Sequence, residues 1–159
     1  MDDITSTVND LCVKAVQYGK SFSKELDYSE RSLKDIEEIL DYYYKDLKGS
    51  FIRNIFRKIK NQEPTDSQIW SMATIWGVYV GEVMCKNNQH RSKWVYEDGF
   101  GSGPFLHIKV DNNNRACPID KVYKRLKNGA EDNIVSFYKV FKDMVLTDKL
   151  SDKKSKEIL

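Results

Sequence analysis

Cysteine is scarce in this sequence, which contains only Cys12, Cys85 and Cys117. An odd number of widely spaced cysteines does not form a disulfide framework. No two of them stand in a CxxC arrangement, so the usual thiolate ligands of a zinc site are missing. Histidine is scarcer still, with His90 and His107 only, and there is no HExxH motif. We therefore expect no metal site and no cofactor.

Long apolar runs and an excess of one charge are also lacking. No stretch approaches the ~20 apolar residues that cross a bilayer, and the polar N-terminus MDDITSTVND does not resemble a signal peptide. We expect no membrane span and a cytoplasmic location. The chain has 26 basic and 24 acidic residues, whereas a committed nucleic-acid binder is strongly basic on one face. Nucleic acid is therefore not the partner that we expect.

What the sequence does contain is typical of one small globular domain. Its 159 residues are 40% hydrophobic and 31% charged, with nine Tyr, seven Phe and three Trp, enough for a packed core. Charge is arranged in blocks: residues 25–46 carry eight acids and three bases, and residues 48–60 carry five bases and no acid. Such blocks can neutralise each other within a fold or across an interface. We expect one domain over residues 1–147 and a charged, disordered tail over residues 148–159.

Apolar residues recur at helical spacing through the first part of the chain. The pattern predicts a helix over residues 3–19 and a second helix that follows Ser29, which we expect to act as its N-cap, with Glu30 in its first turn. A short amphipathic segment, FIRNIFRKIK, occupies residues 51–60 and carries its bases on one side. N-terminal helices are therefore expected before the central helix.

The next helix is the most apolar part of the sequence. Thr65 and Gln68 form a capping box at its start, and the run IWSMATIWGVYVGEVMC is apolar nearly all the way round, which predicts a central, buried helix. Gly77 and Gly81 lie on one face of this helix. Glycine inside a helix costs roughly 1 kcal/mol relative to alanine, so the pair indicates a neighbour packed directly against that face.

The period then changes from helical to alternating, which predicts an antiparallel meander of two or three short strands. KWVYED and PFLHIKV are the first two, joined by the turn GFGSG, and RACPI is the candidate third. Two helices follow: the first ends at Asn128-Gly129, and Glu131 and Asp132 are expected to open the second. The fold class is therefore α+β: N-terminal helices, a central buried helix, a small meander covered on one face, and two C-terminal helices.

Three pieces of the sequence together resemble a known family. The pieces are LDYSERSLKDIEEIL (26–40), WGVYVGEVMCKN (76–87) followed by Trp94, and ACPIDKVYKRLKNGAEDNIVSFYKV (116–140). The second contains a G-x-Y-x-G-E motif and the third a P-x-x-K-V-x-K-R-L-x-N-G motif. In these respects the chain is similar to a family of small, uncharacterised bacterial cytosolic proteins, some of them associated with toxin or immunity genes. The resemblance implies a domain of unknown function, with an immunity-type role as one version, and it points to no particular activity.

Glu82 is the most unusual residue of the central helix. A carboxylate in an apolar helix is costly unless it is paired. One interpretation makes Glu82 a general base or a ligand contact, in a site shared with Tyr79 and Trp94. The other, which we favour, has Glu82 bonded to a Lys, Arg or Trp of the sheet, or to backbone. An ion pair of Arg125 with Glu82 or Asp132 would be structural.

A second candidate surface is basic. Its members are Arg53, Arg57, Lys58 and Lys60, together with Lys86, Arg91 and Lys93. Such a cationic patch can meet an acidic protein, a phosphate-bearing ligand, nucleic acid or a membrane surface. The interpretation that we favour is a solvated face that offsets the acidic helix before it, because a charge run alone is a weak signal.

No catalytic arrangement is present in the sequence. There is no GxSxG elbow, and no second carboxylate stands at helical spacing from Glu82. We therefore expect no catalytic residue and lean towards a non-enzymatic protein-binding module, because opposed charge blocks and abundant Tyr and Trp suit an interface with a protein partner. The alternative is a small-molecule-binding protein or enzyme built around Glu82, Tyr79 and Trp94. A further alternative is a weak nucleic-acid binder that uses the basic face of residues 53–60.

Overall fold

A computed structural model describes residues 2–48, 64–88, 91–111, 114–143 and 145 of the chain. The helices are α1 (Asp2–Ser21), α2 (Ser32–Lys48), α3 (Asp66–Asn87), α4 (Pro118–Asn128) and the 3₁₀ helix η2 (Ala130–Asp132). The strands are β1 (Lys93–Asp98), β2 (Pro104–Lys109) and β3 (Arg115–Ala116). A helical stretch over residues 134–143 follows η2. The basic segment 51–60 and the tail 148–159 lie outside the described residues, so what we expected of them stays a prediction.

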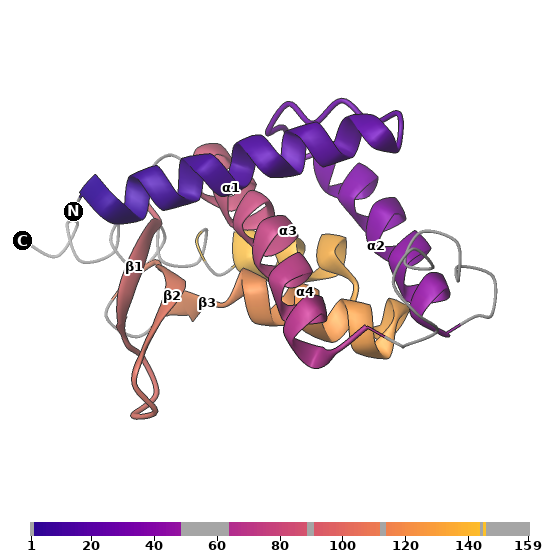
Figure 1. The fold of residues 1–159 in the computed structure, drawn as a ribbon. Helices are drawn as coiled ribbons and strands as arrows, with labels where there is room; N and C mark the ends of the chain where they lie inside the picture. Colours follow the sequence, from indigo (N-terminus) through magenta and orange to yellow (C-terminus); the bar gives the residue numbers. More distant parts are fainter. Residues whose placement is uncertain (1, 49–63, 89–90, 112–113, 144, 146–159) are drawn as a thin grey trace, which may run out of the picture.

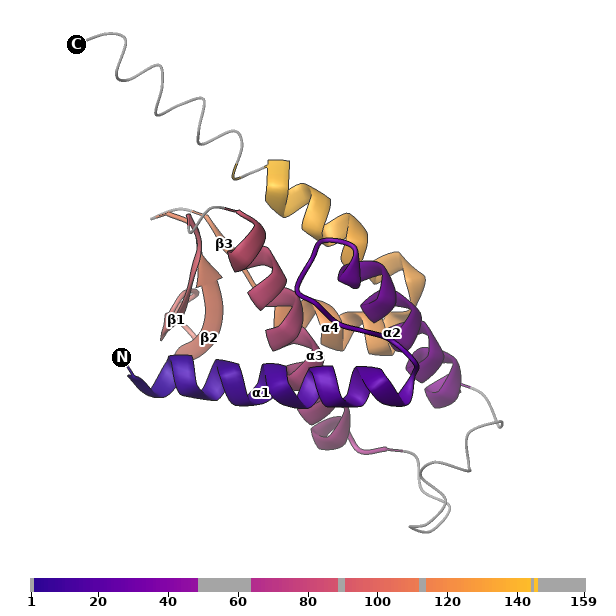
Figure 2. The ribbon, with the colours of Figure 1, turned by 90° about the horizontal axis from the view of Figure 1, so that it is seen from above.

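Helix α3 lies at the centre of the described fold, with the sheet to one side of it and α2 to the other (Figures 1 and 2). The capping box at its start is confirmed: Gln68 N donates to Thr65 Oγ1 at 3.3 Å and Thr65 N donates to Gln68 Oε1 at 2.9 Å. Most of its second half is buried, because α1 packs on one side of the helix and α4 on another.

The two glycines of α3 mark close approaches, as predicted. A Cβ at Gly77 would lie 2.5 Å from the backbone Cα of Ile119, at the start of α4. A Cβ at Gly81 would overlap the ring of Trp94 and come within 3.0 Å of Pro118. Both glycines are therefore required by neighbours that pack directly against the helix backbone, which offsets their low helix propensity.

The sheet has the order β1-β2-β3 and is antiparallel throughout, which confirms the α+β class and the third strand. Residues of one face pack on the helices: Ile108 belongs to the main core, and Leu106 packs against the cluster of Val8 and Cys12 from α1. No described helix lies over the opposite face (Figure 2). The described helices thus cover one side of the meander only. The directly opposed pair Val95 and His107 lies on the other, helix-free side, although His107 itself is fully buried there.

The start of α2 differs from the prediction. The helix begins at Ser32, three residues after the expected cap. Ser29 contributes its carbonyl oxygen, which accepts from Ser32 N at 3.0 Å and from Ser32 Oγ at 2.7 Å. Glu30 does not serve the first turn, because its carboxylate accepts from Tyr138 Oη at 2.9 Å and from Lys142 Nζ at 2.8 Å. Glu30 therefore contacts the C-terminal helical stretch and does not stabilise the first turn of α2.

The last helical stretch also begins later in the chain than the sequence predicted. Glu131 and Asp132 lie in η2, and the stretch begins after Asn133, whose side-chain oxygen accepts from Ser136 N at 2.9 Å. The carboxylate of Asp132 is used by α4 instead, since Lys121 Nζ approaches it at 2.6 Å. The predicted stop at Gly129 is confirmed by its φ of 91°, which favours glycine. Among the described helices, none combines the length and the apolar character that crossing a membrane requires.

Candidate functional site

Glu82 lies where α3 meets β1, and both of its carboxylate oxygens have a protein partner. Trp94 Nε1 donates to Glu82 Oε2 at 3.3 Å. Lys86, one turn later on α3, places its Nζ 3.7 Å from Glu82 Oε1. The side chain of Glu82 is 19% exposed, and Gly81 leaves the space in which the Trp94 ring lies. The geometry matches the pairing with a tryptophan of the sheet that we favoured from the sequence.

Tyr79 is fully buried and joins α3 to the connection before α2. Its hydroxyl accepts from Tyr28 N at 2.9 Å and donates to Ser32 Oγ at 3.0 Å. The Tyr28 and Tyr79 rings are 5.0 Å apart, and Lys86 Nζ lies 4.0 Å from the centre of the Tyr28 ring. Burial raises the pKa of Tyr79, and it raises the pKa of Tyr28 to about 12. Both phenols therefore stay neutral at physiological pH.

The structure thus brings the three residues predicted around the central helix into one chain of contacts. The chain runs from Tyr79 to Tyr28, then to Lys86, Glu82 and Trp94. Sequence reasoning missed Tyr28, which falls in an irregular connection, and took Lys86 for part of a basic surface. Glu82 lines neither the cavity of about 460 Å³ beside Lys93 nor the cavity of about 30 Å³ beside Asp46. A ligand-contacting role for Glu82, Tyr79 and Trp94 stays a prediction.

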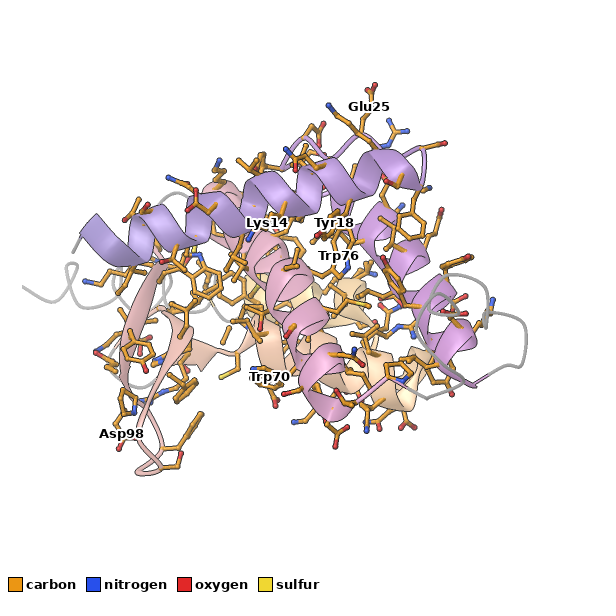
Figure 3. All side chains as sticks on the ribbon, viewed as in Figure 1. Lys14, Tyr18, Glu25, Trp70, Trp76 and Asp98 are labelled. Carbon is orange, nitrogen blue, oxygen red and sulfur yellow. The ribbon has the colours of Figure 1, made fainter. Side chains whose placement is uncertain are left out.

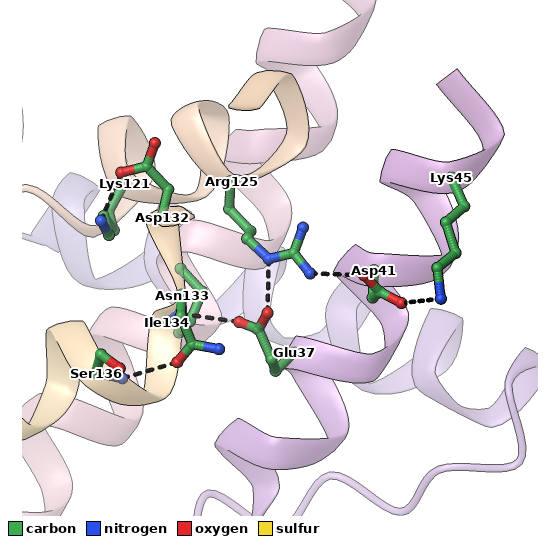
Figure 4. A network of polar contacts seen from close by, with 9 residues as sticks. All are labelled: Glu37, Asp41, Lys45, Lys121, Arg125, Asp132, Asn133, Ile134 and Ser136. Atoms are coloured by element: carbon green, nitrogen blue, oxygen red, sulfur yellow. Dashed lines mark hydrogen bonds and ion pairs between the residues drawn. The ribbon is translucent and has the colours of Figure 1, made fainter. Parts of the chain in front are cut away.

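Arg125 is the most deeply buried charge of the described residues, at 1% exposed. Its Nε donates to Glu37 Oε1 at 2.6 Å and its Nη2 to Asp41 Oδ1 at 3.0 Å (Figure 4). The predicted partners Glu82 and Asp132 are therefore wrong, because the side chain points towards α2. The arrangement ties α2 to α4 and has the geometry of a structural ion pair.

All the acidic residues of α2 except Asp46 have a cation partner within the described part of the chain. Besides Arg125, which pairs with Glu37, Lys24 pairs with Glu38 and with Asp35, the latter at 3.0 Å. These partners come from α4 and from the connection after α1. The acidic block is thus partly neutralised without the basic residues 48–60, of which Arg53, Arg57 and Lys58 lie outside the described residues.

The β1–β2 hairpin projects away from the helices and ends in a tightly held turn (Figures 1 and 3). Asp98 accepts from three backbone N–H groups of the turn, those of Phe100 at 3.0 Å, Gly101 at 2.6 Å and Gly103 at 3.3 Å. These hydrogen bonds lower the pKa of Asp98. Positive φ angles of 76° at Gly101 and 105° at Gly103 explain why the turn is rich in glycine.

This turn presents an aromatic side chain to solvent. Phe100 is 67% exposed, and its ring stacks on Phe105 with the ring centres 5.5 Å apart. The Arg115 guanidinium carbon lies 5.2 Å from the centre of the Phe100 ring, and Arg115 also donates to the Gly99 carbonyl. Phe100 is therefore held in one orientation although most of its surface is open. The sequence showed a hairpin turn here but not the stacking that fixes its aromatic ring.

Groups suited to metal binding or nucleophilic chemistry are not gathered at any of these places. The described residues contain no cluster of three His, Cys, Asp or Glu side chains placed to hold a metal. Burial raises the pKa of Cys12 to about 12 and that of Cys85 to about 11, so both thiols are protonated near neutral pH. His107 is fully buried, with its Nδ1 3.1 Å from the Phe105 carbonyl oxygen.

Comparison with known proteins identifies a family and nothing more specific. A family described as a domain of unknown function, DUF3806, matches residues 52–138, which is more than half of the chain. The match contains the G-x-Y-x-G-E helix and most of the 116–140 piece, whereas the 26–40 piece lies outside it. No curated protein and no solved structure matches the chain. The chain belongs to the DUF3806 family, whose function is unknown.

Proposed function

We propose that this chain is a non-enzymatic protein-binding module and that the β1–β2 hairpin is its contact surface. The observation that carries the proposal is Phe100, an aromatic side chain that is both exposed and held in place by Phe105 and Arg115. Aromatic residues and arginine are enriched among the residues that contribute most to protein interfaces. An ordered side chain also loses little rotamer freedom on binding, which lowers the cost of association.

The backbone of the hairpin supports the same proposal. The Asp98 carboxylate fixes the turn through its three N–H partners, so the tip would not need to order when a partner arrives. Tyr96, which is 59% exposed, offers a second aromatic ring on the opposite face of β1 from Glu97. A partner that contacts both sides of the hairpin would therefore meet an exposed aromatic ring on each side.

Other roles predicted from the sequence have no structural observation that favours them. The immunity-type role specifies a partner that no comparison supports. Nucleic-acid binding depends on residues 53–60, which are not described, and an enzyme built around Glu82 depends on a carboxylate whose two oxygens are already engaged. These roles, and a cytoplasmic location, stay predictions.

The test is a tagged pulldown from a lysate of the source organism at a low and a high salt concentration, read by mass spectrometry. Phe100→Ala is compared with Val140→Ala, which removes a side chain of similar exposure, 69%, from the C-terminal helical stretch. A protein recovered by the wild-type chain and by Val140→Ala, lost from Phe100→Ala, and bound again when purified supports the proposal. A partner retained by Phe100→Ala, or no partner at either salt concentration, overturns it.

A further inference from the structure

A cavity of about 460 Å³ lies on the free face of the sheet, near the end of the strands away from the hairpin turn. Its volume falls within the range of small-molecule sites. Its polar lining comes from Arg91, Ser92, Lys93, Glu97, Lys109 and Asp111. Two of these, Arg91 and Lys93, belong to the cationic patch predicted from the sequence, whereas Lys86 pairs with Glu82 elsewhere.

Basic residues form a row across the sheet at this place. Lys93 is directly opposite Lys109 in the β1–β2 pairing, and Lys109 is directly opposite Arg115 in the β2–β3 pairing. Residues opposed in this way share a face, and like charges there destabilise a sheet. Glu97 offsets part of the charge, since Lys109 Nζ lies 2.9 Å from its Oε1. Lys93 makes no ion pair with a described residue, which leaves a cation available to a ligand.

The acids of the lining are engaged by the protein itself. Glu97 is held by Lys109, and Asp111 accepts from the backbone N and the side-chain Nδ2 of Asn114, both at 2.7 Å. Lys109 therefore offsets the charge of Glu97, whereas Asp111 keeps its charge and is held in place by Asn114. Their arrangement favours an anion over a metal cation, because a cation would have to compete with Lys109 and Asn114 for the same oxygens.

Ser92 borders the cavity but does not offer its hydroxyl to a ligand. The residue is 5% exposed and its Oγ is buried. Its hydroxyl interacts with the Cys85 thiol of α3, and α3 packs on the other side of the sheet. The charge of Lys93 is therefore the feature of the cavity that indicates a ligand.

We propose that this cavity binds a small molecule through an anionic oxygen group, a phosphate or a carboxylate. Lys93 supplies its charge partner, and Arg91 and Lys109 add positive charge to the lining. One Arg91 N–H is used within the protein, by the Val145 carbonyl oxygen at 3.3 Å, and this bond fixes the position of the guanidinium. The site lies apart from the hairpin tip and does not depend on the proposed protein-binding role.

The experiment is isothermal titration of the full chain with inorganic phosphate, pyrophosphate and succinate, each against sodium chloride of matched ionic strength. The variant Lys93→Gln is compared with Lys14→Gln, which removes the same charge from an exposed position of α1. We expect saturable binding by the wild-type chain and by Lys14→Gln, and a Kd raised about tenfold in Lys93→Gln. Preference for the phosphates or for succinate identifies which anion the cavity takes.

Circular dichroism confirms that each variant is folded, and Lys93→Arg, which keeps the charge, should retain binding. Phe100→Ala should leave the affinity unchanged, which separates this proposal from that of the hairpin. The proposal is wrong if none of the three anions binds saturably, or if Lys93→Gln and Lys14→Gln weaken binding equally, since that would be non-specific screening. Binding that occurs only with an oligonucleotide added as a further probe would also overturn it.

Discussion

Arg125 Nε donates to Glu37 Oε1 at 2.6 Å, and the other oxygen of that carboxylate accepts from the backbone N of Ile134 at 2.9 Å (Figure 4). One acidic side chain of α2 thus holds both α4 and the start of the C-terminal helical stretch. Arg125 Nη1 has no hydrogen-bond partner among the described residues. Pairing of this kind makes the loss of either partner costly.

We expect Glu37→Ala to destabilise the chain by about 3 kcal/mol, because it leaves the Arg125 guanidinium buried without its main partner. Urea unfolding measures the change. Glu38→Ala is the matched control, since Glu38 is on the same helix and its ion pair with Lys24 is exposed. Such a pair is worth less than about 1 kcal/mol. Equal losses in the two variants would show that the Arg125 pair contributes no more than a surface contact.

Gly81→Ala should destabilise the protein although it raises helix propensity. The new methyl group overlaps the ring of Trp94, and overpacking costs about 1–3 kcal/mol, which exceeds the gain of roughly 1 kcal/mol in propensity. Thermal unfolding measures the effect. Combining the change with Trp94→Phe, which shortens the ring, should recover part of the loss. A double variant whose loss equals the sum of the two single losses would contradict direct packing between these residues.

Glu82→Gln should change stability by less than about 1 kcal/mol, because the amide oxygen still accepts from Trp94 Nε1. Glu82→Ala removes that acceptor and should cost about 1–3 kcal/mol. Urea unfolding, followed by tryptophan fluorescence, compares the two variants. A clear gain of stability in Glu82→Gln would instead indicate a functional role for this carboxylate, since functional residues are often retained at the expense of stability.

Asp46 should make the stability of the chain depend on pH. Burial raises the pKa of Asp46 to about 6, and the side chain borders a cavity of about 30 Å³ beside α3. The folded state then binds the proton more tightly than the unfolded state, so the free energy of unfolding falls as pH rises from about 4 to about 6. Above about pH 6 the contribution of Asp46 to the free energy of unfolding no longer changes with pH.

Asp46→Asn removes this dependence and should be more stable than the wild-type chain near neutral pH by about 2 kcal/mol. Urea unfolding at about pH 4.5 and about pH 7.5 measures the difference in unfolding free energy between the variant and the wild-type chain. The control is Asp10→Asn, at an exposed position of α1. The difference between Asp46→Asn and the wild-type chain should shrink at the lower pH. A difference that is the same at both values would contradict the raised pKa.

The sequence by itself determined the features that depend on residues a few positions apart. The capping box of Thr65 and Gln68 spans one helical turn, and the alternation of apolar and polar residues fixed the two main strands. Helix-interior glycines correctly indicated close packing against α3, because only a near neighbour explains their cost. For the candidate site, the same reasoning singled out Glu82 as a carboxylate in need of a partner and included a tryptophan of the sheet among its possible partners.

Only the tertiary structure decided which distant groups meet. Arg125 pairs with Glu37, 88 positions away, and Glu30 leaves the first turn of α2 for Tyr138 and Lys142. Neither pairing has a local signal, because a charged side chain accepts any opposite charge that packing brings near. The free face of the sheet, with the fixed Phe100 ring and the cavity beside Lys93, likewise depends on where the helices lie, since alternation shows that a strand has two faces and not which one stays open.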